Sequence, residues 1–156
     1  MNYKVLFFVG SFLLFSGCTV VPTQDDFVES VVQEEIFQFS ENEFDFGVIK
    51  QSGGLVSHDF SFVYHGDESL LVTGTPTSCA CTSGEISDTD LQPGDEGMLT
   101  VTFDPNLHAE PEEKFFKTVV VLTEPTLSTI PEVKIWVDID LDLGPGAYKL
   151  QAPHQD

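Results

Sequence analysis

Two cysteines separated by one residue, Cys79 and Cys81, have the type and spacing in this chain that most directly suggest chemistry. Outside the cytoplasm such cysteines usually pair. Across one intervening residue a disulfide is tight and would be easily reduced, which suits redox exchange. Two thiolates on one side of a loop would also suit a soft metal, Cu(I) or Zn²⁺. The pair therefore predicts a structural bridge, a thiol-redox pair or a metal site, and a structural role is preferred.

A four-coordinate zinc site would need two ligands besides the cysteines. His58, His65 and His108 are the candidates, and the sequence does not place them relative to the pair. His58 shares its parity with neighbouring apolar residues, which favours a position at the edge of the core. Apart from copper or zinc at the cysteine pair, no cofactor is expected. Trp136 lies opposite an apolar strand face, so it is either a candidate contact residue or packed under the tether or a loop.

The sequence contains no nucleophile elbow, phosphate-binding glycine loop or zinc-protease helix motif. Asp138, Asp140 and Asp142 resemble the start of a calcium loop, but Leu143 and Lys149 stand where an EF-hand needs glycine and glutamate. Strict alternation instead predicts that these aspartates lie on the wet face of a strand. An enzyme is not expected.

The chain begins like an exported protein. A short start with Lys4 precedes an apolar run too short to span a bilayer, and small residues then precede Cys18. Phe15–Cys18 resembles the lipobox of bacterial lipoproteins, although Phe15 stands where leucine is usual. Residues 1–17 are therefore predicted to be a signal peptide, with Cys18 as the lipidated residue. A lipid-anchored position in the cell envelope follows, on the outer membrane if there are two membranes.

The charge of the chain limits its partners. The formal net charge is −20, and no arginine occurs. Such a surface repels nucleic acid and anionic lipids, so a covalent lipid on Cys18 is the expected attachment to the membrane. Residues 18–38 are acidic and lack a clean apolar stripe, which predicts a tether. The expected partner is an envelope protein or a glycan.

From residue 39 onward the sequence alternates with a period of two. Apolar and polar residues alternate over 56–64, 99–103 and 133–143, and a further apolar segment covers 115–123. Alternation with β-branched and aromatic residues is typical of half-buried strands. Glycine and proline separate these segments. About seven strands without a convincing helix predict an all-β, antiparallel sandwich over 39–143, followed by a flexible tail at 144–156.

The same segments resemble a known family. They are an opening motif at 44–49, a glycine pair at 53–54, a turn at 64–66, a Ser-Cys-x-Cys-Thr motif at 78–82 and a Pro-Gly turn before a strand at 93–97. Together these motifs are similar to the bacterial domain-of-unknown-function family 1573. The resemblance covers about residues 40–141 and implies an immunoglobulin-like sandwich without an agreed activity. Ala80 replaces the family's central glycine, and His65 replaces its turn asparagine.

Two functions are consistent with these observations. The first is a lipid-anchored envelope sandwich that acts as a protein-interaction or structural module. The second is a thiol-redox or Cu(I)/Zn-binding envelope protein that uses Cys79 and Cys81. An imidazole within reach of accessible sulfurs would favour the second function.

Overall fold

The computed structural model describes residues 36–111 and 113–150. The predicted signal peptide, Cys18 and residues 19–35 of the predicted tether lie outside the described residues, as do residues 151–156. Within the described ranges no helix is long and apolar enough to cross a membrane.

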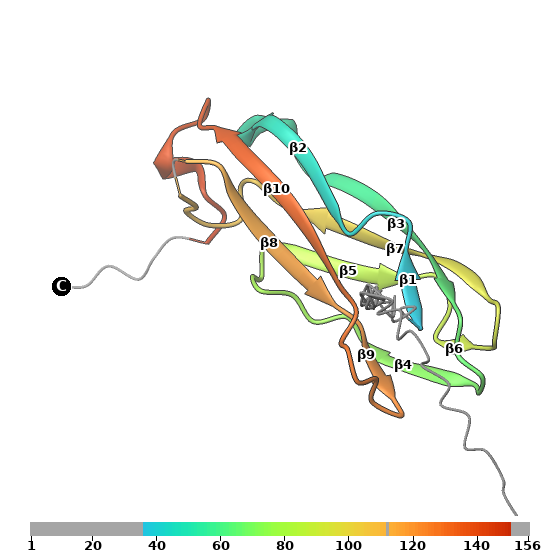
Figure 1. Cartoon of the computed structure of the whole chain (residues 1–156). Coiled ribbons are helices and arrows are strands. Elements are labelled where there is room, and N and C mark those ends of the chain that lie inside the picture. The colour runs from blue at the N-terminus through green and yellow to red at the C-terminus, as the bar shows by residue number, and fades with distance from the viewer. Residues whose placement is uncertain (1–35, 112, 151–156) are drawn as a thin grey trace, which may run out of the picture. The chain divides into compact units, whose positions relative to one another are not determined.

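The described residues form ten strands and two short 3₁₀ helices (Figure 1). The strands are β1 (Phe37–Phe39), β2 (Glu43–Lys50), β3 (Val56–Tyr64), β4 (Leu70–Gly74), β5 (Thr82–Ile86), β6 (Asp90–Leu91), β7 (Glu96–Phe103), β8 (Phe115–Val120), β9 (Leu122–Glu124) and β10 (Glu132–Asp140). The helices are η1 (Gln51–Gly53) and η2 (Pro145–Ala147).

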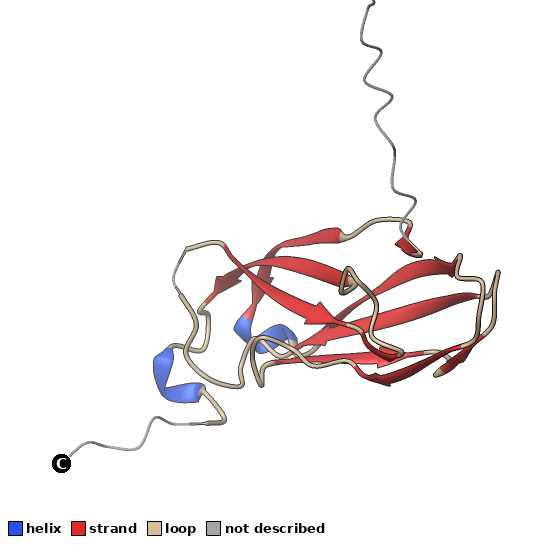
Figure 2. Ribbon diagram, turned by 60° about the horizontal axis from the view of Figure 1, so that its bottom comes forward, coloured by secondary structure: helices blue, strands red, loops and turns tan. Residues whose placement is uncertain are grey.

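The strands form two layers, which are seen edge-on in Figure 2. One layer is the sheet β1-β3-β7-β5. The other contains the sheets β2-β10-β8 and β6-β4-β9. The segment after β4 joins these two sheets, because the Ser78 amide donates to the Thr118 carbonyl over 3.0 Å and Thr77 forms a β-bridge with Val119. The edge of β8 that faces away from β10 is therefore covered by residues 76–78.

The predicted all-β sandwich is confirmed, with two differences in detail. β2 pairs with β10 in parallel, whereas the remaining strand pairs are antiparallel. The predicted strand at 115–123 is divided into β8 and β9 at Val121, whose amide donates to the Pro131 carbonyl over 2.9 Å. Short strands and such interruptions raise the number of strands above the expected seven.

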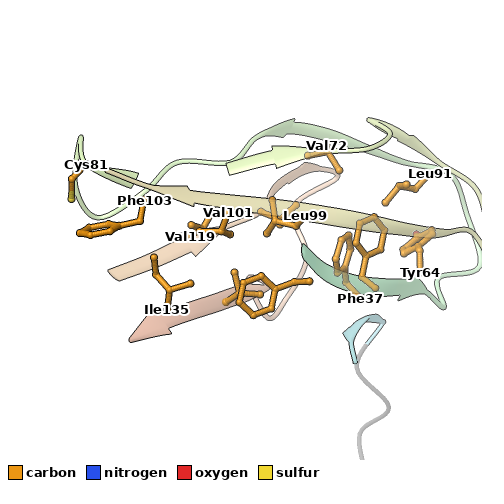
Figure 3. Packing of buried hydrophobic residues seen from close by; sticks show 14 of the residues in the cluster. Phe37, Tyr64, Val72, Cys81, Leu91, Leu99, Val101, Phe103, Val119 and Ile135 are labelled. Carbon is orange, nitrogen blue, oxygen red and sulfur yellow. The ribbon is translucent and has the colours of Figure 1, made fainter. Parts of the chain in front are cut away.

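The core lies between the two layers and is built from the inward residues of the alternating segments. Phe60, Leu99, Phe103 and Val137 are fully buried. Figure 3 shows apolar core side chains in a row, with Cys81 beside Phe103 at one end and Tyr64 and Leu91 at the other. Their removal from water supplies the main force that holds the layers together.

β7 is the strand whose register positions the rest of its sheet. Phe103 is paired with Val56 on one side and with Thr82 on the other. Gly97 faces Phe62, and a Cβ atom at this glycine would overlap the phenylalanine ring. The absence of a side chain at position 97 therefore lets the ring enter the core.

Both ends of the sandwich differ from the predicted boundaries. Phe37, assigned to the tether, begins β1 and is buried in the core. Residues 144–150, assigned to a flexible tail, contain η2 and are held by backbone hydrogen bonds from Lys149 to Asn106 and from Leu150 to Leu107. Tyr148 is buried, and its apolar ring explains why a segment rich in glycine and proline remains attached to the domain.

We predict that Phe37→Ala lowers the free energy of unfolding by about 3–4 kcal/mol, because it removes a buried ring that stacks on Phe62 at a centroid distance of 4.5 Å. Chemical denaturation of the full chain measures the loss. Phe116→Ala is the matched control, since Phe116 is 49% exposed, and it should cost less than about 1 kcal/mol. Equal losses in the two variants would contradict the inclusion of Phe37 in the core.

Candidate thiol and metal site

The connection between β4 and β5 carries a disulfide between Cys79 and Cys81, whose Cα atoms are 5.2 Å apart. Cys79 is half-buried, whereas Cys81 is buried at 3% exposure against the end of the core. Ala80 is exposed between them, and no described residue other than glycine has a positive φ. Alanine in place of the family's glycine therefore needs no left-handed backbone here.

Hydrogen bonds to the backbone fix the conformation of this loop. The Thr82 amide donates to the Cys79 carbonyl over 3.1 Å, and the Thr77 hydroxyl lies 2.8 Å from the same oxygen. The Cys81 amide points at the Cys79 sulfur, with N···Sγ 3.0 Å. The Asp104 amide donates to the Cys81 carbonyl over 2.8 Å and thereby joins the loop to the end of β7.

The chain after β7 brings an imidazole to the disulfide. His108 Nε2 lies 3.2 Å from Cys79 Sγ. The other ring nitrogen, Nδ1, is 3.1 Å from the Ala109 carbonyl, which can only accept a hydrogen bond. In the neutral ring the proton is therefore on Nδ1, and the lone pair of Nε2 faces the sulfur.

A buried carboxylate completes the cluster. Glu110 Oε1 is 3.6 Å from Cys79 Sγ and 3.4 Å from His108 Nδ1, and its side chain is 4% exposed. Its other oxygen accepts a hydrogen bond from Lys117 Nζ over 2.6 Å. The ammonium also lies over the Phe115 ring, 4.9 Å from its centroid. An acid so deeply buried needs such a cation, because an unpaired buried charge is costly.

Cys79, Cys81, His108 and Glu110 each offer a ligand atom, and these atoms all lie within 4.8 Å of one another. In the part of the chain that the structure describes, this is the only group of three or more such residues close enough to share a metal ion. Sulfur, imidazole and carboxylate ligands together are typical of zinc sites. The same groups could instead assist thiol–disulfide exchange at Cys79.

The structure separates the other two predicted histidine ligands from this cluster. The His58 ring stacks on Phe44 at a centroid distance of 3.5 Å, and its Nε2 is 2.8 Å from Glu41. This agrees with its predicted place at the edge of the core. His65 lies in the turn after β3, 3.2 Å from Gln38. Of the three candidates, only His108 is brought to the cysteines.

Comparison with known proteins then identifies the family. Residues 37–136 match the family described as "Protein of unknown function (DUF1573)". The chain belongs to DUF1573. No curated protein matches it.

This chain is similar to several solved structures at low sequence identity. A protein of unknown function from Porphyromonas gingivalis W83 is 12% identical, with a TM-score of 0.53 over 66% of this chain and 46% of that one. The PapD-like domain 7 of human CEP192 is 11% identical, with a TM-score of 0.48 over 68% and 86% of the two chains. The E. coli chaperone DraB is 11% identical, with a TM-score of 0.45 over 66% and 55%. The DUF1573 chain thus spans less than half of the P. gingivalis protein, and the likeness concerns the fold alone.

Trp136 lies on the outer face of the sheet β2-β10-β8 and is half-buried. Its ring packs against Phe116 at a centroid distance of 5.1 Å, and Lys134 Nζ lies over both rings. The indole Nε1 donates to Glu43 over 2.9 Å. The residue therefore belongs to an aromatic patch of Phe116 and Trp136 on this sheet face.

Glu110, a member of the cysteine cluster, and its partner Lys117 were missed in the sequence. Lys117 carried a signal, because it stands at an inward parity between Phe115 and Val119, where a lysine needs a buried acid as partner. Glu110 carried none, since it is one of 26 acidic residues in the chain and lies in an irregular loop. Asp138, Asp140 and Asp142 lie along the outer side of β10 and the turn after it, as the alternation predicted.

The hydrogen bond from Trp136 is the largest cause of a lowered pKa at Glu43, followed by the hydrogen bond from Lys134. We predict that Trp136→Phe raises the pKa of Glu43 toward its ordinary value, as measured by NMR titration of the side-chain carboxyl. Because the folded pKa is lowered, this carboxylate stabilises the fold above its ordinary pKa, and the contribution is lost as the pH falls. The pKa of Asp142, which Ser52 lowers, should not change. An unchanged pKa of Glu43 in Trp136→Phe would show that the hydrogen bond from the indole is absent in solution.

Proposed function

We propose that this protein is a lipid-anchored, extracytoplasmic β-sandwich that acts as an interaction module of the cell envelope and has no catalytic activity of its own. The lipid is carried by Cys18, and the sandwich binds an envelope protein or a glycan. In a cell with two membranes the anchor lies in the outer membrane. Phe15–Cys18 supports the anchor.

The aromatic patch is the observation that carries the interaction proposal. Phe116 is 49% exposed, and it lies beside the half-buried Trp136 on one sheet face. Aromatic residues are enriched at the centres of interfaces, where they bury a large area at low entropic cost. Glu43 and Lys134 contact the patch, and Asp138 is the next outward residue of β10, so charged side chains border it as at the polar rim of an interface.

This proposal is tested with a photocrosslinking amino acid placed at position 116 of the full chain in its own cells. A specific crosslinked product is expected in the membrane fraction, and Trp136→Ala should reduce it at least about tenfold, as loss of a central aromatic contact does. Cys18→Ser should move the protein out of the membrane fraction and weaken the product.

The control places the same crosslinker at Ser57, which is exposed on β3 of the opposite sheet. Equal products at positions 116 and 57 would contradict a role for the aromatic patch. Membrane retention of the Cys18→Ser variant would contradict the lipid anchor independently.

A second candidate function is thiol–disulfide exchange, and the 3.2 Å contact between His108 and Cys79 favours it. A partner thiolate would attack Cys79 Sγ, the more exposed sulfur, and Cys81 would leave as a thiolate. When the dithiol form acts on a partner disulfide, the Cys79 thiolate attacks one partner sulfur, the other partner sulfur leaves as a thiolate, and the Cys81 thiolate then attacks Cys79 Sγ and releases the first. The Cys81 amide, and the His108 imidazole when it is protonated, stabilise the Cys79 thiolate.

For this function we predict that the pair alkylates only after mild reduction, as intact mass shows. In the presence of a chelator, His108→Ala should slow the reaction of the reduced protein with a small disulfide about tenfold and alter its pH profile. His65→Ala is the matched control and should react like the wild type, because His65 lies near Gln38 and away from the sulfurs. A His108→Ala variant with unchanged rate and pH profile would rule out assistance by the imidazole.

A further inference from the structure

We propose that the dithiol form of this protein binds one divalent zinc-like cation through Cys79, Cys81, His108 and Glu110, with Lys117 as the partner that holds Glu110. The disulfide form does not bind the cation, so the cysteine pair makes metal binding dependent on redox state. The inference uses the same sulfurs as the second candidate function but does not require exchange with a partner protein.

The four ligand atoms are already nearly close enough to bind one ion. They lie within 4.8 Å of one another, whereas ligands of a tetrahedral zinc ion are separated by roughly 3.3–3.8 Å. Closing this difference needs side-chain movements on the order of 1 Å. The two sulfurs must separate after reduction, and a Cα–Cα distance of 5.2 Å allows both to reach one ion from the same loop.

The groups around the ligands are arranged as outer-shell partners of a metal site usually are. The Ala109 carbonyl holds the proton of His108 on Nδ1, so Nε2 is free to bind a cation. The Cys81 amide points at Cys79 Sγ and would donate to its thiolate. Lys117 binds one oxygen of Glu110, and the other oxygen is the one that faces Cys79.

The charge of the site favours a divalent cation over Cu(I). Two thiolates and the Glu110 carboxylate bring three negative charges, and Lys117 brings one positive charge. A divalent ion therefore leaves the site neutral, whereas Cu(I) leaves one uncompensated negative charge in a largely buried place. The carboxylate is also a poor ligand for the soft Cu(I) ion and a normal ligand for Zn²⁺.

Reduction must precede binding, and a dithiol supplies it. One reductant thiolate attacks Cys79 Sγ, the Cys79–Cys81 bond breaks, and Cys81 leaves as a thiolate. The second reductant thiol then displaces Cys79, so two electrons pass to the cysteines and the reductant becomes a disulfide. Zinc binding afterwards releases the remaining thiol protons to water.

The test uses the full chain, reduced with a phosphine under anaerobic conditions, freed of reductant and titrated with Co²⁺ as a spectroscopic probe. We expect one equivalent to give the thiolate charge-transfer and intense visible bands of a tetrahedral site, and Zn²⁺ to displace it. Cys79→Ser/Cys81→Ser should abolish the bands. This variant retains Cys18 and therefore shows any signal that arises from that residue.

Ligand variants make the assignment specific. His108→Ala and Glu110→Gln should each weaken zinc binding at least tenfold, and Lys117→Met should weaken it about tenfold as an outer-shell change. His65→Ala is the matched control and should bind like the wild type. Glu110→Gln and Lys117→Met disturb a buried ion pair, so the far-ultraviolet circular dichroism of each variant is compared with that of the wild type to check folding. His108 is partly exposed, and His108→Ala should therefore fold normally.

Binding by the disulfide form, no Co²⁺ bands in the dithiol form, or unchanged affinity in His108→Ala would each overturn the proposal. Tight Cu(I) binding without zinc binding would overturn the charge argument and leave a copper site. If metal binding fails while His108→Ala still slows disulfide exchange, the second candidate function stands alone. Metal binding without such an effect on exchange leaves the zinc proposal standing and removes the exchange function.

Discussion

The burial of β7 between two partner strands is the constraint on which the rest of the structure depends. Its inward residues Leu99, Val101 and Phe103 are fully buried, and its register with β5 places Phe103 opposite Thr82. Slippage by one residue would turn every one of these side chains toward water. The same register brings Cys81 to the end of β7, where the Asp104 amide binds its carbonyl. The core therefore determines where the cysteine loop meets the loop that carries His108.

The cluster around the disulfide combines two levels of organisation. The loop that carries the cysteines is fixed by its own backbone hydrogen bonds and by residues 76–78 along β8. The carboxylate of Glu110 reaches the sulfurs only because Lys117, on an inward position of β8, offsets its charge at the edge of the core. Removal of one charge would leave the other buried without a partner, which costs more free energy than burial of the pair. A site of this kind is therefore built by the sheet as much as by the loops.

The two proposed functions occupy different parts of the same sandwich. The aromatic patch of Phe116 and Trp136 lies on the outer face of the sheet β2-β10-β8, whereas Lys117 points from the same strand β8 toward the cysteine cluster. Alternate residues of a strand face opposite sides, so one strand contributes to both sites. Binding at the patch and chemistry at the sulfurs can therefore coexist in one protein, and neither requires the other.

The sequence by itself determined the fold class and the outward aspartates of β10, because alternation and turn residues are local properties. It singled out Cys79 and Cys81 but left open a structural bridge, a redox pair and a metal site. It placed the domain boundaries less well, since Phe37 and Tyr148 are held by distant parts of the chain. Only the tertiary structure decided which histidine reaches the cysteines and revealed Glu110 as a buried acid. These contacts join the connection between β4 and β5 to the connection between β7 and β8. The two loops are distant in the sequence and are brought together by the packing of the core, so no local sequence pattern predicts their distance.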